Sequence, residues 1–245
     1  MSGSKTIEIA GYIRNDILKG HYSTGDRLQA ERELAAKYDA HRSSVREALK
    51  ILEQEGLIYN SRGSCPRVQA LHKASTNLLP YLLFRDEVPN LDLFRQMFEV
   101  LDLLVTNAIE LALKNGSAEQ ISQAVEMVEE LISDNIQDRH AIINRLLALI
   151  VESTNNIVLK LMYNAIDPTL HERLGTYLNR IPWGYSEHAG VMIGILKNAI
   201  ANRDIQTAVF TAKQMIQYRQ SYVLEFMQSD LRQKEEGTLE AGVAG

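Results

Sequence analysis

Residues 25–63 read GDRLQAERELAAKYDAHRSSVREALKILEQEGLIYNSRG, and they carry the clearest structural pattern in the chain. Two short helical patterns flank a tight connection at residues 38–40. In the second pattern Val45, Leu49 and Leu52 follow one another at i, i+4 and i+7, which places them on one buried face of a helix. The segment is therefore predicted to form two helices joined by a turn.

The same spacing leaves basic and polar residues at the exposed N-terminal end of the second helix: His41, Arg42, Ser43 and Arg46. A helix of this kind, held at an angle by a preceding helix, fits a recognition helix in the major groove of DNA. Arginine can donate two hydrogen bonds to O6 and N7 of guanine, so Arg42 and Arg46 are predicted to contact DNA. Arg32 on the preceding helix is predicted to join them.

The sequence does not assign a single role to the serines and the histidine near these arginines. Ser43 and Ser44 are expected to hold phosphates or to cap the helix. His41 could cap the helix, bind a phosphate or simply be exposed. Outside a helix-turn-helix, arginines on helices are usually ordinary solvated charge.

A short hairpin is predicted after the second helix, where Leu57-Ile58-Tyr59 and Arg67-Val68 flank a basic tip that contains Arg62 and Gly63. Together with the two helices it would make a winged helix-turn-helix. An ordinary hairpin turn is the alternative for the tip. Cys65 is the only cysteine of the chain, which excludes an intrachain disulfide framework and leaves a redox sensor without a resolving partner.

This pattern resembles the GntR family of bacterial transcription regulators. The matching segments are Gly25-Asp26 before Leu28, residues 31–35 (ERELA), residues 42–49 (RSSVREAL) and residues 52–57 (LEQEGL). The resemblance covers nearly all of residues 7–68, and Gln29 departs from it, since the family usually has proline there. It implies that the wing tip at Arg62-Gly63 enters the minor groove, where arginine meets concentrated negative potential.

Length and composition set the broad class. The chain has 245 residues and 45% hydrophobic residues, enough for one large or two modest domains. No apolar run reaches the ~18 residues of a membrane span, and the stretch at residues 10–18 is too polar for a signal peptide. A cytoplasmic protein without a membrane partner is therefore expected.

Charge is divided unevenly along the chain. Residues 1–72 hold 11 Lys and Arg against 9 Asp and Glu, a net of +2, whereas the remainder holds 15 against 22, a net of −7. This asymmetry suits a DNA-reading head joined to an acidic helical body that does not touch phosphate.

Helical periodicity dominates the rest of the chain, with no strand expected after residue 70 and a kink or break at Pro168. The predicted helices are Ile7–Leu18, Leu91–Asn115, Ala118–Ile136, Asp138–Ser153, Ile157–Arg180, Ser186–Asn202 and Asp204–Gln228. The predicted fold class is mainly α, a winged helix-turn-helix followed by an all-α bundle of six or seven helices. The predicted domains are a DNA-binding domain at 1–72, a linker at 73–89, a helical effector-binding and dimerisation domain at 90–230, and a disordered tail at 231–245; residues 1–5 are also expected to be disordered.

The helical part is similar to the FadR-type subfamily, many members of which bind a metal through one Asp and three His. Alignment to that subfamily places apolar residues at those four positions: Ile142, Leu146, Ile193 and Met215. Leu101 stands where an arginine often anchors a carboxylate effector. The resemblance thus implies no metal and no cofactor, and a largely apolar effector such as a fatty acid or its coenzyme A thioester.

The candidate effector residues are Leu101, Ile142, Leu146, Tyr163, Arg173, Tyr177, Ile193, Met215 and Tyr218. Arg173 and Arg180 are near enough in sequence to meet a polar head group. The same residues could equally fill an ordinary core. His140, His171 and His188 lack the i, i+4 spacing of a helical metal motif and are taken as satisfied or surface histidines.

The chain is therefore predicted to be a homodimeric, ligand-responsive transcription regulator, a repressor that binds a near-palindromic operator in double-stranded DNA. The alternative is an effector-free dimeric DNA-binding or scaffold protein with a filled core. No glycine-rich phosphate loop, nucleophile elbow or Cys/His constellation occurs in the sequence, so it is not expected to be an enzyme.

Overall fold

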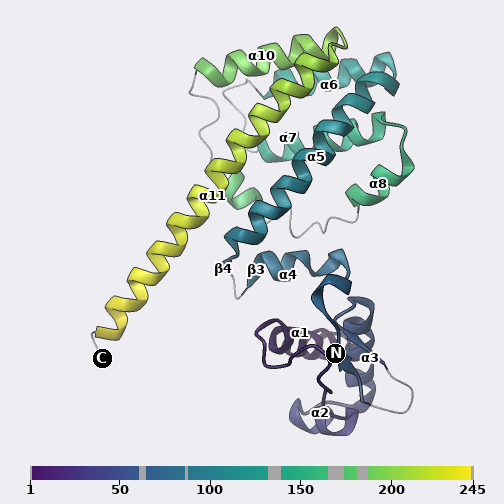
Figure 1. Ribbon diagram of the computed structural model, residues 1–245, viewed down its shortest axis with the longest axis vertical. Coiled ribbons are helices and arrows are strands. Elements are labelled where there is room, and N and C mark those ends of the chain that lie inside the picture. The colour runs from purple at the N-terminus through teal and green to yellow at the C-terminus, as the bar shows by residue number, and fades with distance from the viewer. Residues whose placement is uncertain are drawn as a thin grey trace. The chain divides into compact units, whose positions relative to one another are not determined.

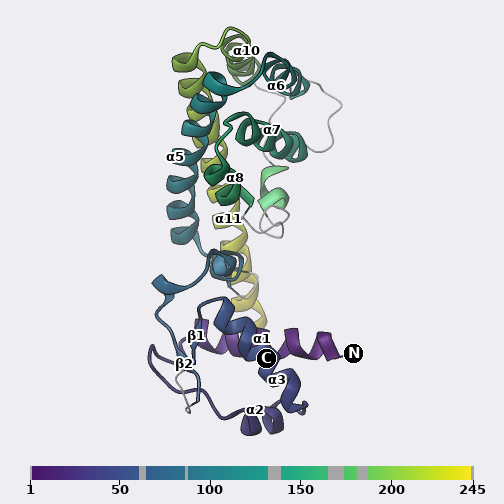
Figure 2. The same cartoon turned by 90° about the vertical axis from the view of Figure 1, so that its right-hand side faces the viewer.

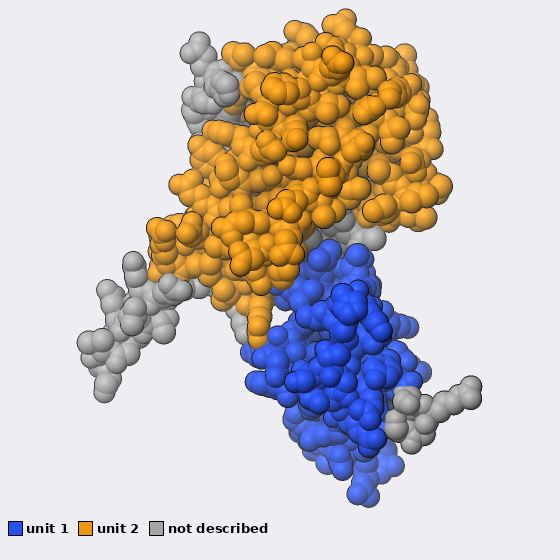
Figure 3. Space-filling model, viewed as in Figure 1, with its two compact units in different colours: residues 1–82 blue, residues 83–245 orange. Residues whose placement is uncertain are grey.

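The computed structural model divides into two compact units, Met1–Leu82 and Leu83–Gly245 (Figure 3). It describes residues 2–60, 65–85, 88–131, 139–164, 174–180 and 187–243. Helices make up most of both units (Figure 1), which confirms the predicted mainly α fold class.

The first unit holds a winged helix-turn-helix. Its elements are α1 Ser2–Leu18, α2 Glu31–Lys37, α3 Arg42–Gln54, β1 Ile58–Tyr59, β2 Arg67–Val68, the 3-10 helices η1 Leu71–Lys73 and η2 Thr76–Leu78, and α4 Leu79–Leu83, which ends at the boundary of the units. β1 and β2 pair antiparallel, with Ile58 opposite Val68. Residues 25–28 join them, because the amides of Gly25 and Leu28 donate to the Val68 and Pro66 carbonyls.

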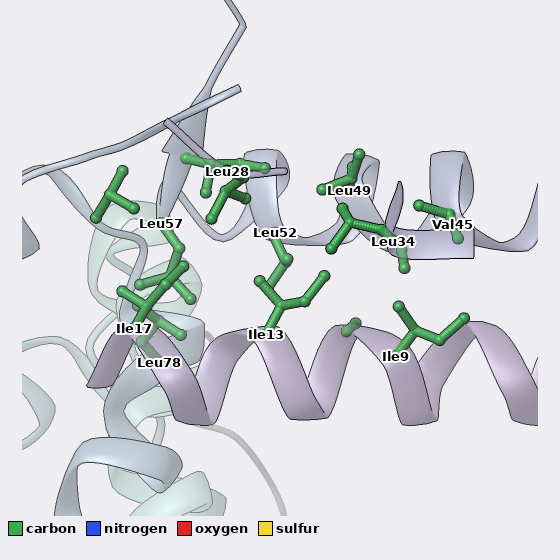
Figure 4. Packing of buried hydrophobic residues seen from close by; sticks show 14 residues of the cluster. Ile9, Ile13, Ile17, Leu28, Leu34, Val45, Leu49, Leu52, Leu57 and Leu78 are labelled. Carbon is green, nitrogen blue, oxygen red and sulfur yellow. The ribbon is translucent and has the colours of Figure 1, made fainter. Parts of the chain in front are cut away.

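The core of this unit forms between α1 and α3. Ile9, Ile13 and Ile17 follow one another at i, i+4 and i+8 and point from α1 toward the apolar side chains of α3 and its neighbours (Figure 4). The predicted inner face of the second helix is confirmed, since Val45, Leu49 and Leu52 are all buried. Burial of apolar area on this scale stabilises the unit by about 25 cal/mol per Å².

Helix α1 begins earlier than expected. Residues 1–5 are expected to be disordered from the sequence, but α1 starts at Ser2. Once Ile7–Leu18 is fixed against α3, adding further residues to the helix gains one hydrogen bond each without a new nucleus. An ion pair between Lys5 and Glu8 at 3.4 Å lies in this added turn.

The second unit is a bundle of helices. Its elements are β3 Phe84–Arg85, β4 Val88–Pro89, α5 Leu91–Asn115, α6 Ala118–Glu130, α7 Arg139–Ser153, α8 Ile157–Asn164, α10 Glu187–Ala201 and α11 Ile205–Val243. The long helices α5 and α11 lie side by side, α7 packs on α5 and α6, and α10 packs on α6 and α11 (Figures 1 and 2). None of the described helices is long and apolar enough to cross a membrane.

Local capping explains where several of these helices start. The side chain of Asn90 accepts a hydrogen bond from the Leu93 amide at the start of α5. A capping box starts α6: the Ser117 amide donates to Oε1 of Gln120 at 2.9 Å, and the Gln120 amide donates to Oγ of Ser117 at 3.1 Å.

Two expectations about this unit were wrong. The first was the absence of strands after residue 70: β3 and β4 form an antiparallel pair, with Phe84 opposite Pro89. Strands of two residues are too short to show an alternating pattern. Phe84 anchors this pair by packing edge-on against Phe94 of α5, with ring centroids 5.2 Å apart.

The second was the end of the last helix. We expected it near Gln228, followed by a disordered tail at 231–245, but α11 continues to Val243. Residues 229–236 read SDLRQKEE, mostly good helix formers that carry charge. A helix already fixed by packing extends easily through such residues, whereas their polarity alone suggested a loose tail.

Some predicted features lie outside the described residues. The predicted helix Ile157–Arg180 is described as α8 up to Asn164 and as helical again at residues 174–178. Pro168 lies between these two pieces, so the predicted kink or break there falls outside the described residues, as does His171.

Candidate nucleic-acid interface

The recognition helix α3 has two chemically distinct faces. The inner face is buried and consists of Ser44, Val45, Ala48, Leu49 and Leu52. The predicted contact residues His41, Arg42, Ser43 and Arg46 are all exposed at the N-terminal end of the helix. The structure therefore brings together two arginines, a hydroxyl and an imidazole on one solvent-facing edge.

The turn between α2 and α3 fixes the position of this edge. Asp39 adopts a left-handed backbone conformation with φ of 44°. The Ala40 amide then donates to the Ala35 carbonyl at 3.0 Å, which closes the end of α2. Leu34 is buried beneath the turn, and Tyr38 stacks on Tyr12 of α1 with centroids 5.7 Å apart. Packing on both sides thus holds the start of α3 in place.

Ser44 differs from the other predicted contact residues of α3 because it is buried. Its relative exposure is only 4%, since it lies one turn before Ala48 on the buried face. Its predicted role, holding a phosphate or capping the helix, stays a prediction. Ser43, on the exposed side, retains the predicted role.

His41 occupies the N-cap position of α3, with φ of −68° and ψ of 145°, but its side chain makes no capping hydrogen bond. Of the three roles left open by the sequence, the helix cap is therefore excluded. Its exposed imidazole stands at the start of the helix, where the helix dipole favours an anion such as a phosphate.

Arg46 is held by a carboxylate from the preceding helix. Its Nε and Nη2 atoms donate to Oε1 and Oε2 of Glu31, at 3.2 and 3.0 Å. The hydrogen bond from Arg46 lowers the pKa of the Glu31 carboxyl and raises the pKa of the Arg46 guanidinium. Sequence analysis did not single out Glu31; the only signal was its place at the first position of the ERELA segment, immediately before Arg32.

Arg32 lies on α2 and is exposed. Among the described residues, neither Arg32 nor Arg42 forms an ion pair, although the charge of Arg42 also contributes to lowering the pKa of Glu31. Long exposed cationic side chains of this kind reach phosphates or base edges at little cost in fold stability.

The wing is described only at its base. Arg62 and Gly63, the predicted tip, lie outside the described residues. At the base, Arg67 donates from Nη1 to the Gly25 carbonyl at 2.6 Å, which ties the hairpin to residues 25–28. Arg67 is thus engaged in the fold, and Cys65 beside it is half-buried.

The predicted effector residues fall into separate environments in the second unit. Ile142, Leu146 and Ile193 are buried, whereas Leu101 and Met215 are half-buried. Tyr163 is half-buried, donates to the Asn144 carbonyl at 3.4 Å, and has its pKa raised by burial. Tyr177 stacks on Phe84 with centroids 6.4 Å apart.

Tyr218 does not line the interior, which corrects the prediction. It is 41% exposed and packs on Tyr222 of the same helix in a tilted arrangement, with ring centroids 4.8 Å apart. Its position on the helix points it away from Val223, the buried residue five positions later. Arg173 lies outside the described residues.

The cationic groups of this unit are placed differently from the expectation. Arg180 makes a two-pronged ion pair with Asp230 at 2.8 and 3.1 Å and lies over the Phe226 ring. It is therefore already engaged by a carboxylate. Burial lowers the pKa of the Arg219 guanidinium to about 10. Sequence reasoning missed Arg219, although it interrupts the buried stripe of α11 formed by Ala212, Val223 and Met227.

Metal-ligand residues do not gather in the described part of the chain: no group of three or more His, Cys, Asp and Glu side chains lies close enough there to hold an ion. His140, one of the three histidines considered above, lies 3.0 Å from the Asn144 amide nitrogen.

Residues 5–68 match the family model described as "Bacterial regulatory proteins, gntR family". The chain is 30% identical over 171 residues to the HTH-type transcriptional regulator Mce2R of Mycobacterium tuberculosis, covering 66% of this chain and 70% of that protein. It is 28% identical over 173 residues to the galactonate operon transcriptional repressor of Escherichia coli, covering 68% and 74%.

A solved structure has the same fold over most of the chain. The regulator Lar, described as controlling the agr system of Listeria monocytogenes, superposes with a TM-score of 0.55 at 14% identity, covering 90% of this chain and 96% of that one. At this identity the likeness concerns the fold alone.

Proposed function

This chain belongs to the gntR family of bacterial regulatory proteins, and from that premise we propose that it is a homodimeric repressor whose operator binding is modulated by a small organic acid. Membership of the family makes it a DNA-binding transcription regulator and not an enzyme. Within the proposal, Met1–Leu82 reads DNA and Leu83–Gly245 dimerises and binds the effector. Its place of action is the cytoplasm, where the operator is.

The observation that carries the DNA-reading part is the exposed edge of α3. Arg42, Ser43 and Arg46 stand together on a helix whose other face is fully committed to the core. Arginines so placed can read guanine in the major groove, while Ser43 and Arg32 position the head on the phosphates. Arg62 and Gly63 are proposed to add a minor-groove contact.

A two-fold symmetric dimer on a near-palindromic operator follows from the size of one head. A single winged helix makes few base contacts, and tight specific binding at physiological salt needs more interface than that. Two-fold dimers are the commonest solution among soluble proteins, and each head then reads one half-site. Repression is favoured by the likeness to the galactonate operon transcriptional repressor of Escherichia coli.

For the effector we propose an acid with an apolar chain, a fatty acid or its coenzyme A thioester, consistent with a FadR-type helical body. Ile142, Leu146 and Ile193 provide buried apolar surface in that body. Arg219 adds a desolvated cation, and a charge in a low-dielectric interior attracts an anion more strongly than an exposed one does. Apolar surface with one placed charge suits such an amphiphile.

A hydroxylated sugar acid is the second candidate. The name of the Escherichia coli relative refers to galactonate, which carries one carboxylate and no apolar chain. Arg219 could hold the same carboxylate, but the hydroxyls would need further polar partners inside the body. An effector-free dimer with a filled core remains the third reading.

One titration separates these readings. A labelled operator, obtained by selecting bound DNA from a random pool, is titrated with the protein, and then fatty acids of increasing length, their coenzyme A thioesters or galactonate are added. We expect release by the apolar acids and not by galactonate. Release by galactonate alone would replace the first candidate with the second, and no release by any compound would leave the filled core.

Variants locate the proposed site in the same assay. Arg219→Met removes the buried charge at similar length, and Lys213→Met removes an exposed charge from the same helix as a control. The effector should release the operator from wild type and from Lys213→Met but not from Arg219→Met. Equal release from all three would show that Arg219 does not hold the acid.

A further inference from the structure

The pair between Glu31 and Arg46 joins the first residue of α2 to the exposed edge of α3. Fifteen residues separate the two in sequence, and both carboxylate oxygens are used, at 3.2 Å from Nε and 3.0 Å from Nη2. Two parallel hydrogen bonds fix the plane of a guanidinium as well as its position.

This arrangement occupies one edge of the guanidinium and leaves the other open. Arginine has five N–H donors: one on Nε and two each on Nη1 and Nη2. Glu31 takes the Nε hydrogen and one hydrogen of Nη2. A second edge, made of Nη1 and the other hydrogen of Nη2, remains for a two-pronged bond to O6 and N7 of guanine.

Fold stability does not explain the pair. The side chain of Arg46 is 62% exposed and that of Glu31 is 37% exposed, so water screens their attraction. Exposed ion pairs of this kind contribute little to stability. Glu31 also places a negative charge beside a surface that must approach phosphates, which weakens binding to DNA of any sequence.

We propose that Glu31 is a positioning residue for sequence readout: it holds the open edge of Arg46 toward one guanine and, by its charge, lowers affinity for unrelated DNA. Both effects widen the gap between operator and random sequence. This inference rests on the proposed reading of bases by α3. The opposite possibility is that Glu31 merely competes with DNA for Arg46.

The test compares five proteins on matched DNA. Wild type, Glu31→Gln, Glu31→Asp, Glu47→Gln and Arg46→Ala are titrated against the selected operator, against operators with one base pair changed at each position, and against random DNA. Glu47→Gln is the charge control. Glu47 is a glutamate on the exposed surface of α3, next to Arg46 in sequence, but its carboxylate pairs with Lys50 at 2.8 Å. Thermal unfolding checks that each variant is folded.

Glu31→Gln is expected to lose roughly tenfold in discrimination at the single base pair read by Arg46, the scale of one good two-pronged contact. Glu31→Gln and Glu47→Gln should both bind random DNA more tightly than wild type, and to a similar extent as each other. Glu47→Gln should keep the wild-type discrimination between base pairs. Glu31→Asp keeps the charge on a shorter side chain, so a general charge effect predicts wild-type discrimination, whereas a positioning role predicts only partial discrimination.

Two results would overturn the inference. If Glu31→Gln keeps wild-type discrimination at every base pair, Arg46 needs no positioning. If it binds operator and random DNA more tightly by equal factors, Glu31 only competes. Arg46→Ala tests the premise that Arg46 reads a base. Wild-type affinity and discrimination in that variant would mean that Arg46 reads no base, so that Glu31 has nothing to position.

Discussion

At the scale of single residues, positions that look alike in sequence differ in what surrounds them. Ser43 and Ser44 are adjacent serines at the start of α3, yet one is exposed and the other is buried. Arg42 and Arg46 are one turn apart, yet the structure pairs only the second with Glu31. Residue type alone does not distinguish the roles of these residues. Their exposure and their bonding partners do, and both depend on the neighbouring helix.

Two glycines of the first unit also look alike in sequence but differ in their surroundings, and the effect on stability can be measured. Gly20 and Gly56 both have positive φ, 80° and 70°. A Cβ at Gly56 would lie 2.9 Å from the Lys73 carbonyl oxygen, whereas at Gly20 nothing lies within 4 Å. Gly20→Ala should therefore cost about 1–2 kcal/mol from backbone strain alone, and Gly56→Ala clearly more.

Hydrogen exchange of the α1 and α3 amides in the full chain measures this loss within the first unit. The expected order of protection is wild type, then Gly20→Ala, then Gly56→Ala. Equal losses in the two variants would mean that the backbone at Lys73 moves aside freely, contrary to the packing described.

At the scale of elements, a buried ion pair connects three helices of the first unit. Arg14 of α1 donates to both carboxylate oxygens of Glu55, the C-cap of α3, at 3.0 and 2.5 Å. The Arg14 guanidinium also lies 4.0 Å from the ring centroid of Tyr81 on α4. The Glu55 carbonyl accepts from the Ser75 amide, so the chain leaving the wing is fixed at the same place.

Arg14→Met should destabilise the first unit by about 3–5 kcal/mol, because it leaves the Glu55 carboxylate buried without its partner. Arg14→Met combined with Glu55→Leu should recover much of that loss, since an apolar pair needs no compensation. Amide exchange in α1 and α3 reports both values. A double variant no more stable than Arg14→Met would argue that the pair is not desolvated as described.

Elements differed in how far the sequence could predict them. The helix-turn-helix followed from the spacing of Val45, Leu49 and Leu52, and α5 from a long periodic run. The hairpin β3–β4 did not, because strands of two residues carry no period. The Glu31–Arg46 pair was also beyond reach, since it depends on how α2 and α3 cross.

The candidate effector site was less predictable than the DNA-reading edge. Alignment identified buried positions such as Ile142 and Ile193, whereas Tyr218, chosen as an aromatic residue that could line a cavity, is exposed. Arg219 was missed because a lone arginine in a sequence is usually solvated, and only packing shows that its guanidinium is buried. A site made by side chains from several helices depends on their rotation, which periodicity defines only loosely.

At the scale of the whole molecule, regulation requires that an effector bind one state of the dimer better than the other. An effector shifts operator affinity only by its differential affinity for the two states. In the proposed mechanism it changes the spacing of the two heads, so that they no longer match two half-sites. Dimerisation is therefore a condition for both binding and release.

We expect the protein to be a dimer in solution at micromolar concentration and to bind one dimer per near-palindromic site. Because one head alone makes too few contacts, an operator reduced to a single half-site should bind far more weakly. Sedimentation of the free protein and of the complex measures both stoichiometries. A monomer with full affinity for the intact operator would contradict the expectation.

The central claim is that the exposed edge of α3 reads DNA sequence, and its most direct test is Arg42→Ala measured against the selected operator and against random DNA at one salt concentration. Losing a two-pronged base contact should weaken operator binding roughly 5- to 150-fold. Random DNA should lose much less, and the oligomeric state should not change. Wild-type affinity for the operator, or an equal loss on operator and random DNA, would contradict the claim.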